Sequence, residues 1–282
     1  MNGSRPGISV IVPTHNRVES LQRCLARLAA QETSESLEII VVDDGSDAAE
    51  QIADVVACTP GARLLRQAKH GPAAARNAGV GAALGSVVCF TDDDCEPGPN
   101  WAKLLADSVR RGAEVAAGVT TNGEAGSWFA RAAHVQVEHF AHESRVPFAA
   151  SNNIASTSRL LREVPFDSRY TGAAEDRDWC ERLAGRGYRI QYEPAASVFH
   201  HQQLTLAGYV RKQIRYGRGS WSYHRRTSRR SFERPTFYIA LLRRGFREQV
   251  GIGMLVVLGQ AAMAVGYLYE WRSSKRAEGR AT

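Results

Sequence analysis

The sequence predicts an α/β protein whose mostly parallel sheet is flanked by helices, followed by a basic helical region and one apolar helix. Apolar runs at residues 7–12, 37–42 and 86–90 end in turn residues and alternate with segments of helical period. These runs are apolar on both faces, which is typical of parallel strands covered by helices on two sides. An uncharged stretch at 250–269 adds a helix of a different kind.

The first half of the chain alternates strands with helices. Residues 7–12 form a β-rich run that ends at Pro13, and residues 17–30 place Leu21, Leu25 and Leu28 on one helix face. The same reasoning predicts further strands at 37–42, 63–66, 86–90 and 114–119, and further helices at 47–57, 72–83 and 100–110.

The second half of the chain is less regular. We expect helices at 128–142, 156–164 and 175–186, strands at 188–192 and 197–200, and a basic helix at 204–216 that ends at Gly217.

The positive charge lies late in the chain. The formal net charge is +7 over 282 residues, and residues 211–248 hold twelve Lys or Arg against Glu233 and Glu248. Such a basic block indicates an anionic partner, which is lipid headgroups, phosphates or nucleic acid. The predicted divisions are a main domain at 1–220, a basic juxtamembrane segment at 221–249, an apolar helix at 250–271 and a basic tail at 272–282.

The apolar stretch has the length of a membrane helix. Residues 250–269 carry no charge, and a helix of about 20 residues is about 30 Å long, the thickness of bilayer hydrocarbon. Arginines precede the stretch, and Trp271 with further basic residues follows it, as at membrane interfaces. The helix either spans the membrane or lies in its plane, and a buried core helix is the third interpretation.

The remaining composition bears on the compartment. Five scattered cysteines show no CxxC or Cys/His metal spacing, which suits a reducing compartment. The N-terminus enters the first strand without a long apolar signal region. Together with the basic block, these features favour the cytoplasmic face of the cell membrane.

Polar side chains follow the ends of three predicted strands. They are Pro-Thr-His-Asn-Arg at 13–17, Asp-Asp-Gly-Ser at 43–46 and three aspartates at 92–94. Ligands of parallel α/β sheets bind beyond the carboxyl ends of the strands. We therefore expect the three groups to converge on one crevice.

The aspartates suggest a metal. Asp92 and Asp94 present oxygen ligands of the kind that Mg²⁺ or Mn²⁺ prefers, and such a cation can bridge a diphosphate. A solvated acidic loop that caps the next helix explains the same residues without a metal. The turn at 13–17 lacks G-x-G-x-x-G, which argues against a dehydrogenase, and the chain has no GxxxxGK[ST] phosphate loop.

Glu175 and Asp176 begin a predicted helix. Carboxylates at a helix N-terminus are often caps. Alternatively, one of them is a general base that takes a proton from an acceptor hydroxyl.

Six segments in this order resemble the family 2 glycosyltransferases: SVIVPTHNR (9–17), VVDDGS (41–46), GPAAARNAG (71–79), FTDDD (90–94), the SNNIA to PFD stretch (151–167) and AAEDRDW (173–179). The match covers roughly residues 7–220. It implies the GT-A fold, a Rossmann-like sheet, with a nucleotide-diphosphate-sugar donor, a divalent cation (Mg²⁺ or Mn²⁺) and an inverting mechanism.

The resemblance assigns roles to individual residues. Asp176 matches the catalytic base, and Asp94 matches the metal ligand, with Asp92 and His200 beside it; His201 is an alternative to His200. The residues that correspond to nucleotide and donor binding are Pro13, Thr14, Arg17, Asp43, Asp44, Arg76, Asp92 and Asp93. Those of the acceptor and donor-sugar region are Asn152, Asn153, Glu175 and Arg215.

Two departures limit the resemblance. Val164-Pro165 stands where the family often has Gly-Gly before Phe-Asp, so the shape of that loop differs. The Gln-x-x-Arg-Trp of processive synthases is replaced by Gln213-Ile214-Arg215-Tyr216, which disfavours processive polymerisation. The implied function is non-processive transfer, from a UDP-sugar by default, to a glycan or lipid-linked acceptor in cell-surface glycan or glycolipid assembly.

Three other functions remain open. A nucleotidyltransferase that makes nucleotide sugars has a similar sheet, but it normally carries a glycine-rich phosphate loop after the first strand. The basic block suggests a membrane-anchored nucleic-acid binder, yet such a domain needs no uncharged stretch of twenty residues, and we expect no nucleic-acid partner. A non-catalytic sugar-binding protein is the third.

Overall fold

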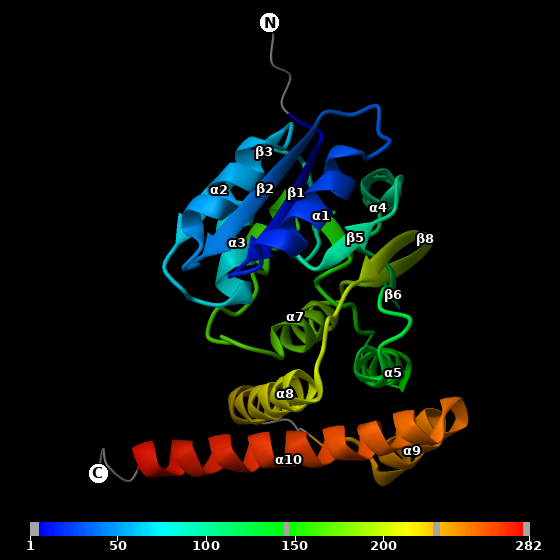
Figure 1. Cartoon of the computed structure of the whole chain (residues 1–282). Helices are drawn as coiled ribbons and strands as arrows, with labels where there is room; N and C mark the ends of the chain where they lie inside the picture. The colour runs from blue at the N-terminus through cyan, green and yellow to red at the C-terminus, as the bar shows by residue number, and fades with distance from the viewer. Residues whose placement is uncertain (1–5, 144–146, 228–231, 279–282) are drawn as a thin grey trace, which may run out of the picture. The chain divides into compact units, whose positions relative to one another are not determined.

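The computed structural model describes residues 6–143, 147–227 and 232–278, which fall into two compact units (Figure 1). The first unit comprises Met1–Gly123, Val146–Thr171 and Glu175–His201, and the second comprises Glu124–Arg145, Gly172–Ala174 and Gln202–Thr282. The predicted α/β class is confirmed, with a sheet in the first unit and helices in the second.

One half of the sheet is parallel. Strands β1 (Ile8–Thr14), β2 (Leu37–Asp44), β3 (Ala62–Gln67) and β4 (Val87–Phe90) pair in the order β3-β2-β1-β4. The register sets Thr14 of β1 beside Asp43 of β2, and Ile11 beside Phe90 of β4. The carboxyl ends of these strands consequently lie at one edge.

The other half makes the sheet mixed rather than parallel. Strand β7 (Ile154–Thr157) is antiparallel to both β4 and β6 (Val115–Asn122), and β8 (Ile190–His200) pairs with β6 and with β5 (Cys95–Pro97). The sequence reading was wrong at β7, where a helix was expected from 156, and at β8, which was expected as two strands. It missed the short β5.

Helices cover both faces of the sheet. Helices α1 (Val18–Ala29), α2 (Ala49–Ala57) and α4 (Trp101–Arg110) pack their apolar residues into one buried cluster. Helices α3 (Pro72–Ala82), α6 (Ser158–Glu163) and α7 (Glu175–Ala184) contribute to a second cluster. Alternate residues of β1 enter the two clusters, as a strand buried on both faces requires.

The second unit is built from α5 (Trp128–Glu143), α8 (Leu206–Thr227), α9 (Pro235–Glu248) and α10 (Val250–Glu278). The basic helix does not end at Gly217 as predicted. A methyl group at Gly217 would overlap the carbonyl oxygen of Met263, so this glycine permits close packing of α8 against α10. Helix α9 lies within the segment predicted to be basic and juxtamembrane.

Two further expectations concern the whole chain. All five cysteines are free thiols, and only Cys58 among them is exposed. Within the described part of the chain, Val250–Arg276 is the one helix whose length and composition would let it cross a bilayer.

Candidate functional site

Asp93 joins the end of β4 to the end of β1. Its Oδ2 accepts a hydrogen bond from the Thr14 hydroxyl at 2.8 Å, and its Oδ1 accepts one from Arg17 Nη1 at 3.0 Å. The same Arg17 nitrogen lies 2.6 Å from Asp94 Oδ2. Burial raises the pKa of Asp93 to about 7; Arg17 opposes this shift and Asp94 adds to it. Two of the three predicted strand ends therefore meet at one place.

The third strand end adjoins them. The backbone N–H of Asn16, which follows β1, donates to Ser46 Oγ at 2.9 Å. Ser46 in turn donates its backbone N–H to Asp43 Oδ1 at 3.0 Å, at the end of β2. The groups at 13–17, 43–46 and 92–94 thus form one connected polar edge, as expected.

Asp44 holds the loop that leads from β3 into α3. Its Oδ1 accepts from Gln67 Nε2 at 2.7 Å and from the backbone N–H of His70 at 2.8 Å, and its Oδ2 accepts from the backbone N–H of Gly71 at 2.8 Å. Gly71 has φ +92, in the left-handed region that favours glycine. Both carboxylate oxygens of Asp44 therefore act on the chain's own backbone and side chains, while its place at the sheet edge is the predicted one.

Arg76 connects the aspartate cluster to the start of α7. Its Nη2 donates to Asp92 Oδ1 at 2.8 Å, and its Nη1 donates to Glu175 Oε1 at 3.1 Å. The guanidinium also lies over the ring of Phe166, at 5.7 Å from the ring centroid. Arg76 is only 3% exposed, so it forms a buried bridge between two acidic groups. Its contact with a nucleotide stays a prediction.

Asp176 has an incomplete set of partners. Its Oδ2 accepts from the backbone N–H of Ser151 at 3.3 Å, while the buried Oδ1 has no hydrogen-bond partner among the described residues. Burial and the neighbouring Glu175 raise the pKa of Asp176 to about 7, against the opposing charge of Arg76. A buried carboxyl oxygen without a donor is an exception that needs a reason, and a ligand hydroxyl would supply one.

Asp94, Cys95 and His200 bring together three possible metal ligands. One ligand atom of each lies within 4.8 Å of the others, and His200 Nε2 is 3.1 Å from Asp94 Oδ1. The sulfur of Cys95 is a soft ligand, which suits Mn²⁺ and Mg²⁺ less well than oxygen or nitrogen does. Carboxylate oxygen with imidazole nitrogen remains, a donor set that fits Mn²⁺ and, through the carboxylate, Mg²⁺.

The two predicted asparagines differ in their surroundings. Asn153 receives the indole N–H of Trp101 at 2.8 Å and donates to the backbone oxygen of Ala196 at 3.2 Å, so its side chain holds the sheet together. Asn152 contacts Cys95 Sγ at 3.7 Å, next to the aspartates. Of this pair, Asn152 is the one whose side chain lies beside the acidic cluster.

Two predicted residues lie apart from these networks. Pro13 is buried within β1 and pairs in register with Val42 of β2. Arg215 belongs to the second unit, where its guanidinium lies 5.9 Å from the ring centroid of Tyr216. The roles of both stay predictions.

Sequence reasoning missed three participants. Ser151 supplies the N–H that fixes Asp176, Phe166 supports Arg76, and Cys95 lies next to Asp94. The signal available for Ser151 and Cys95 was their position directly beside residues that had been selected. Phe166 lies in the Phe-Asp pair of a matched segment, but its contact with Arg76 could not be predicted, because it joins residues far apart in the chain.

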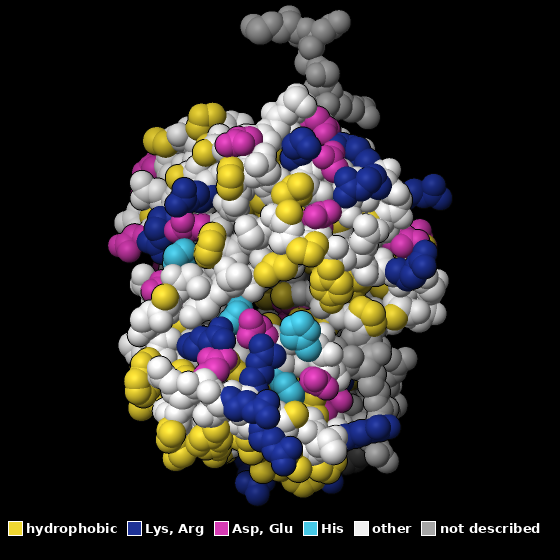
Figure 2. Space-filling view, turned by 90° about the vertical axis from the view of Figure 1, so that its right-hand side faces the viewer, with side chains coloured by type: hydrophobic (Ala, Val, Ile, Leu, Met, Phe, Trp, Pro, Cys, Tyr) yellow, Lys and Arg dark blue, Asp and Glu magenta, His cyan; other side chains and the backbone are white. Residues whose placement is uncertain are grey.

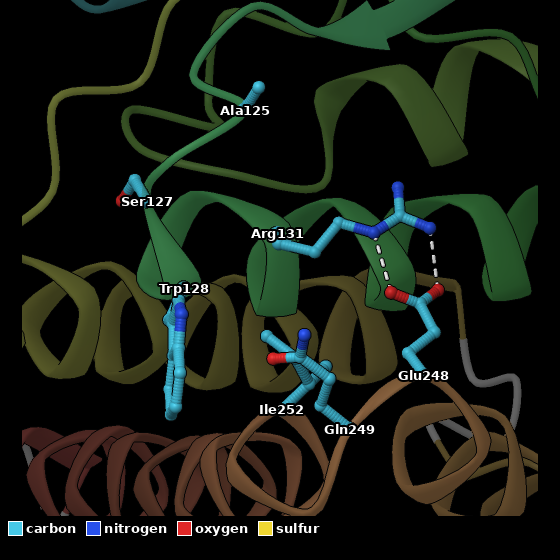
Figure 3. Close-up of a pocket in the computed structure, with 7 residues that line it drawn as sticks. All are labelled: Ala125, Ser127, Trp128, Arg131, Glu248, Gln249 and Ile252. Carbon is cyan, nitrogen blue, oxygen red and sulfur yellow. Dashed lines mark hydrogen bonds and ion pairs between the residues drawn. The ribbon is translucent and has the colours of Figure 1, made fainter.

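The second unit contains a separate cavity of 240 Å³ (Figure 3). Ser127, Trp128 and Arg131 line it from the start of α5, and Gln249 and Ile252 line it from the start of α10. Arg131 forms a two-pronged ion pair with Glu248, with Nε at 2.6 Å from the carboxylate. No residue predicted for the site lines this cavity.

Known proteins are similar to this chain in sequence and in fold. Residues 9–168 match the model of glycosyl transferase family 2. The pre-mycofactocin glycosyltransferase of Mycobacterium tuberculosis is 30% identical over 225 residues, which cover 76% of this chain and 47% of that protein. The chain thus spans about half the length of this relative. Glycosyltransferase AglE of Haloferax volcanii is 26% identical over 246 residues, covering 82% of this chain and 80% of that protein.

A solved structure has a similar fold. The mannosyltransferase PcManGT from Pyrobaculum calidifontis, in complex with GDP-Man and Mn²⁺, aligns with a TM-score of 0.60 at 20% identity, over 99% of this chain and 81% of that one. This likeness confirms the GT-A type of fold. Since the family model covers more than half of the chain and includes all three strand ends that build the polar edge, the protein belongs to glycosyl transferase family 2.

Proposed function

We propose that this chain is an inverting glycosyltransferase that moves a sugar from a nucleotide-diphosphate donor to an acceptor hydroxyl. The proposal rests on the surroundings of the Asp176 carboxyl group. Its pKa is raised to about 7 by burial, and its Oδ1 lacks a partner among the described residues. A carboxylate with a pKa near the working pH is suited to accept a proton as the hydroxyl attacks.

Arg76 and Ser151 would keep this base in place. The Ser151 N–H fixes Asp176 Oδ2, and Arg76 fixes the adjacent Glu175 against Asp92. One displacement then inverts the anomeric carbon, and the proton of the acceptor passes to Asp176 Oδ1 without a covalent enzyme intermediate.

Asp94 and His200 would hold a divalent cation, Mn²⁺ or Mg²⁺. Asp92, the other predicted ligand, lies outside this group and accepts a hydrogen bond from Arg76. When bound, the cation would supply positive charge to the departing diphosphate. Arg17, which pairs with the other carboxylate oxygen of Asp94, places a positive charge at this edge of the sheet. Its side chain is half-exposed, so a phosphate would reach it from solvent while it stays paired with Asp93 and Asp94.

The nucleotide would lie along the edge formed by Thr14, Asp43 and Asp44. Asp44 engages three donors of the loop that ends at Gly71 and so fixes the wall of this region. UDP-sugars are the default donor from the sequence. GDP-mannose also deserves a place in the screen, because the structurally similar mannosyltransferase contains it.

The acceptor would be a glycan or a lipid-linked sugar. Asn152 and Glu175 border the region that it would occupy, and Arg215 stays a candidate contact. The basic block and α10 support association with the cytoplasmic face of the membrane, where single, non-processive transfers would serve cell-surface glycan or glycolipid assembly. A membrane-bound acceptor would then be met at the surface to which the enzyme binds.

A donor screen tests this proposal. We would incubate the full chain with a panel of UDP- and GDP-sugars and Mn²⁺, measuring the nucleoside diphosphate released and the shift in thermal midpoint. We expect one or two donors to be hydrolysed slowly and to protect the protein, and Asp176→Asn to bind them without turnover. Release of pyrophosphate would instead indicate a nucleotidyltransferase, and no response to any donor would contradict the proposal.

A further inference from the structure

Helix α10 has two different faces along the whole of its uncharged part. Its buried face contains Ile252, Val256, Gly259, Ala262 and Gly266, which recur every three or four residues. Its exposed face, which we name the apolar stripe, contains Val250, Met254, Val257, Leu258, Ala261, Ala264, Val265, Leu268 and Tyr269. Every member of the stripe is apolar or aromatic, and Val250, Met254 and Val265 are 71%, 59% and 58% exposed. A surface of this kind in a monomer marks an interaction site.

The buried face packs along α8, side by side in Figure 1. The Tyr209 hydroxyl donates to the carbonyl oxygen of Leu255 at 2.7 Å, near the start of α8. A methyl group at Gly266 would overlap the carbonyl oxygen of Ile214, farther along both helices. Near the far end, the Trp221 indole donates to Ser274 Oγ at 3.1 Å. The two helices therefore run in the same direction, in contact over residues 209–221 and 255–274.

The neighbouring helix is strongly basic in this contact region. Arg211, Arg215 and Arg218 are exposed on α8, and Lys212 is half-buried. If α10 crossed the bilayer, α8 would have to enter the hydrocarbon beside it and carry these charges to that depth. Charged side chains at the bilayer centre are costly and normally face a protein interior or a water-filled cavity, whereas these arginines are exposed.

An in-plane position removes this conflict. A helix that lies at the level of the headgroups can bury one apolar face among the acyl chains, while long basic side chains reach anionic phosphates. Basic residues surround the stripe at both ends, with Arg247 preceding α10 and Arg272 and Lys275 following Tyr269. Figure 2 shows surface hydrophobic side chains interspersed with Lys and Arg.

We propose that α10 is an in-plane interfacial helix that binds an anionic phospholipid surface through the apolar stripe, and that it does not span the membrane. The inference rests on the membrane association proposed above and is independent of glycosyl transfer. The occupant is the bilayer, because the charge beside the stripe is positive, and neutral partners would not require it.

A vesicle-binding measurement tests the surface. The full chain is mixed with liposomes containing phosphatidylglycerol, or with phosphatidylcholine alone, and floated on a density gradient. We expect binding to the anionic liposomes that weakens with salt, and a loss of about ten-fold or more in Val265→Glu. Leu84→Glu is the matched control, since Leu84 is an equally exposed apolar residue, at 58%, in the first unit, and should bind as the wild type. Equal binding of both variants, or a soluble dimer that does not bind liposomes, would overturn the assignment.

A labelling measurement tests the orientation. The parent chain exposes only Cys58, in the first unit, to a membrane-impermeant maleimide. In a Cys58→Ser background, Gln249→Cys and Ser273→Cys place single exposed thiols just before α10 and near its end. In inverted membrane vesicles, all three thiols should react from the same side. Reaction of the thiols at 249 and 273 from opposite sides would show a spanning helix while leaving membrane association intact.

Discussion

Arg76 Nη2 donates to Asp92 Oδ1 at 2.8 Å from a position that is 3% exposed. Nη1 of the same guanidinium donates to Glu175 Oε1, 99 positions further along the chain. One buried charge thereby fixes the aspartates after β4 relative to the first turn of α7, which carries the proposed base. The two halves of the site cannot shift independently without breaking this pair of ion pairs.

Replacement of Arg76 should therefore strongly lower the free energy of unfolding. Arg76→Gln leaves Asp92 and Glu175 without their shared cation, and loss of one partner of a buried ion pair costs roughly 3–5 kcal/mol. Chemical denaturation of the purified variant measures the change. Lys103→Gln, which removes a surface pair with Asp107, is the control and should cost less than about 1 kcal/mol. Similar costs for the two variants would contradict a buried bridge.

The raised pKa of Asp176 predicts that this carboxyl group lowers the stability of the protein at high pH. Since the folded state holds this proton up to a pKa of about 7, stability falls as the pH rises from the unfolded value near 4 to about 7. Asp176→Asn has no proton to lose, so it should be more stable than the wild type at pH 8, by up to about 4 kcal/mol. The difference should shrink towards pH 4. Thermal melts of both proteins across this range measure it, and a difference independent of pH would show that the carboxyl titrates normally.

Gly71 gives a test of the loop that Asp44 holds. Its φ is +92, and a methyl group there would lie 2.9 Å from the carbonyl oxygen of Thr171. We expect Gly71→Ala to destabilise the protein by about 1–3 kcal/mol. Gly81→Ala is the control, because it lies in α3 with no atom within 4 Å of the added methyl group, and it should be neutral or stabilising. Equal changes in stability for the two variants would show that an alanine is not strained at position 71.

Metal binding can be measured without any substrate. Asp94→Ala should weaken Mn²⁺ binding by about ten- to a hundred-fold, as titration calorimetry would show, and His200→Ala should weaken it less. Glu96→Gln is the control, since Glu96 is a neighbouring carboxylate that pairs with Arg27 and His201 instead. Mn²⁺ affinity equal in the Asp94 variant and the wild type would place the cation elsewhere.

The parallel half of the fold and its polar edge were predictable because their signals are local. Apolar runs such as β1 and β2 are followed at once by the residues that they position, and parallel strands bring those residues to one edge. The positions of Asp92, Asp94 and Asp176 at the ends of elements were predictable for the same reason, while their roles stay predictions. Each lies at the end of a strand or at the start of a helix that its own neighbours define.

The rest depended on contacts between distant segments. Strand β7 has four residues and exists because it pairs with β4 and β6, so its sequence alone resembled the start of the helix that follows. Gly217 was predicted to end the basic helix, but its role is to let α8 pack closely against the backbone of Met263 in α10. Asn153 and Arg76 were chosen as ligand contacts, and the sequence gave no sign of their buried partners Trp101 and Glu175, which come from distant segments.

The central claim is that Asp176 is the base of a metal-assisted glycosyl transfer. The most direct measurement is turnover of the donor found in the screen, with its acceptor, by the wild type, Asp176→Asn and the surface control Asp107→Asn at pH 8. The account predicts that Asp176→Asn loses at least about a thousand-fold in kcat with little change in donor affinity, while Asp107→Asn behaves as the wild type. Turnover by Asp176→Asn within a few-fold of the wild type would contradict it.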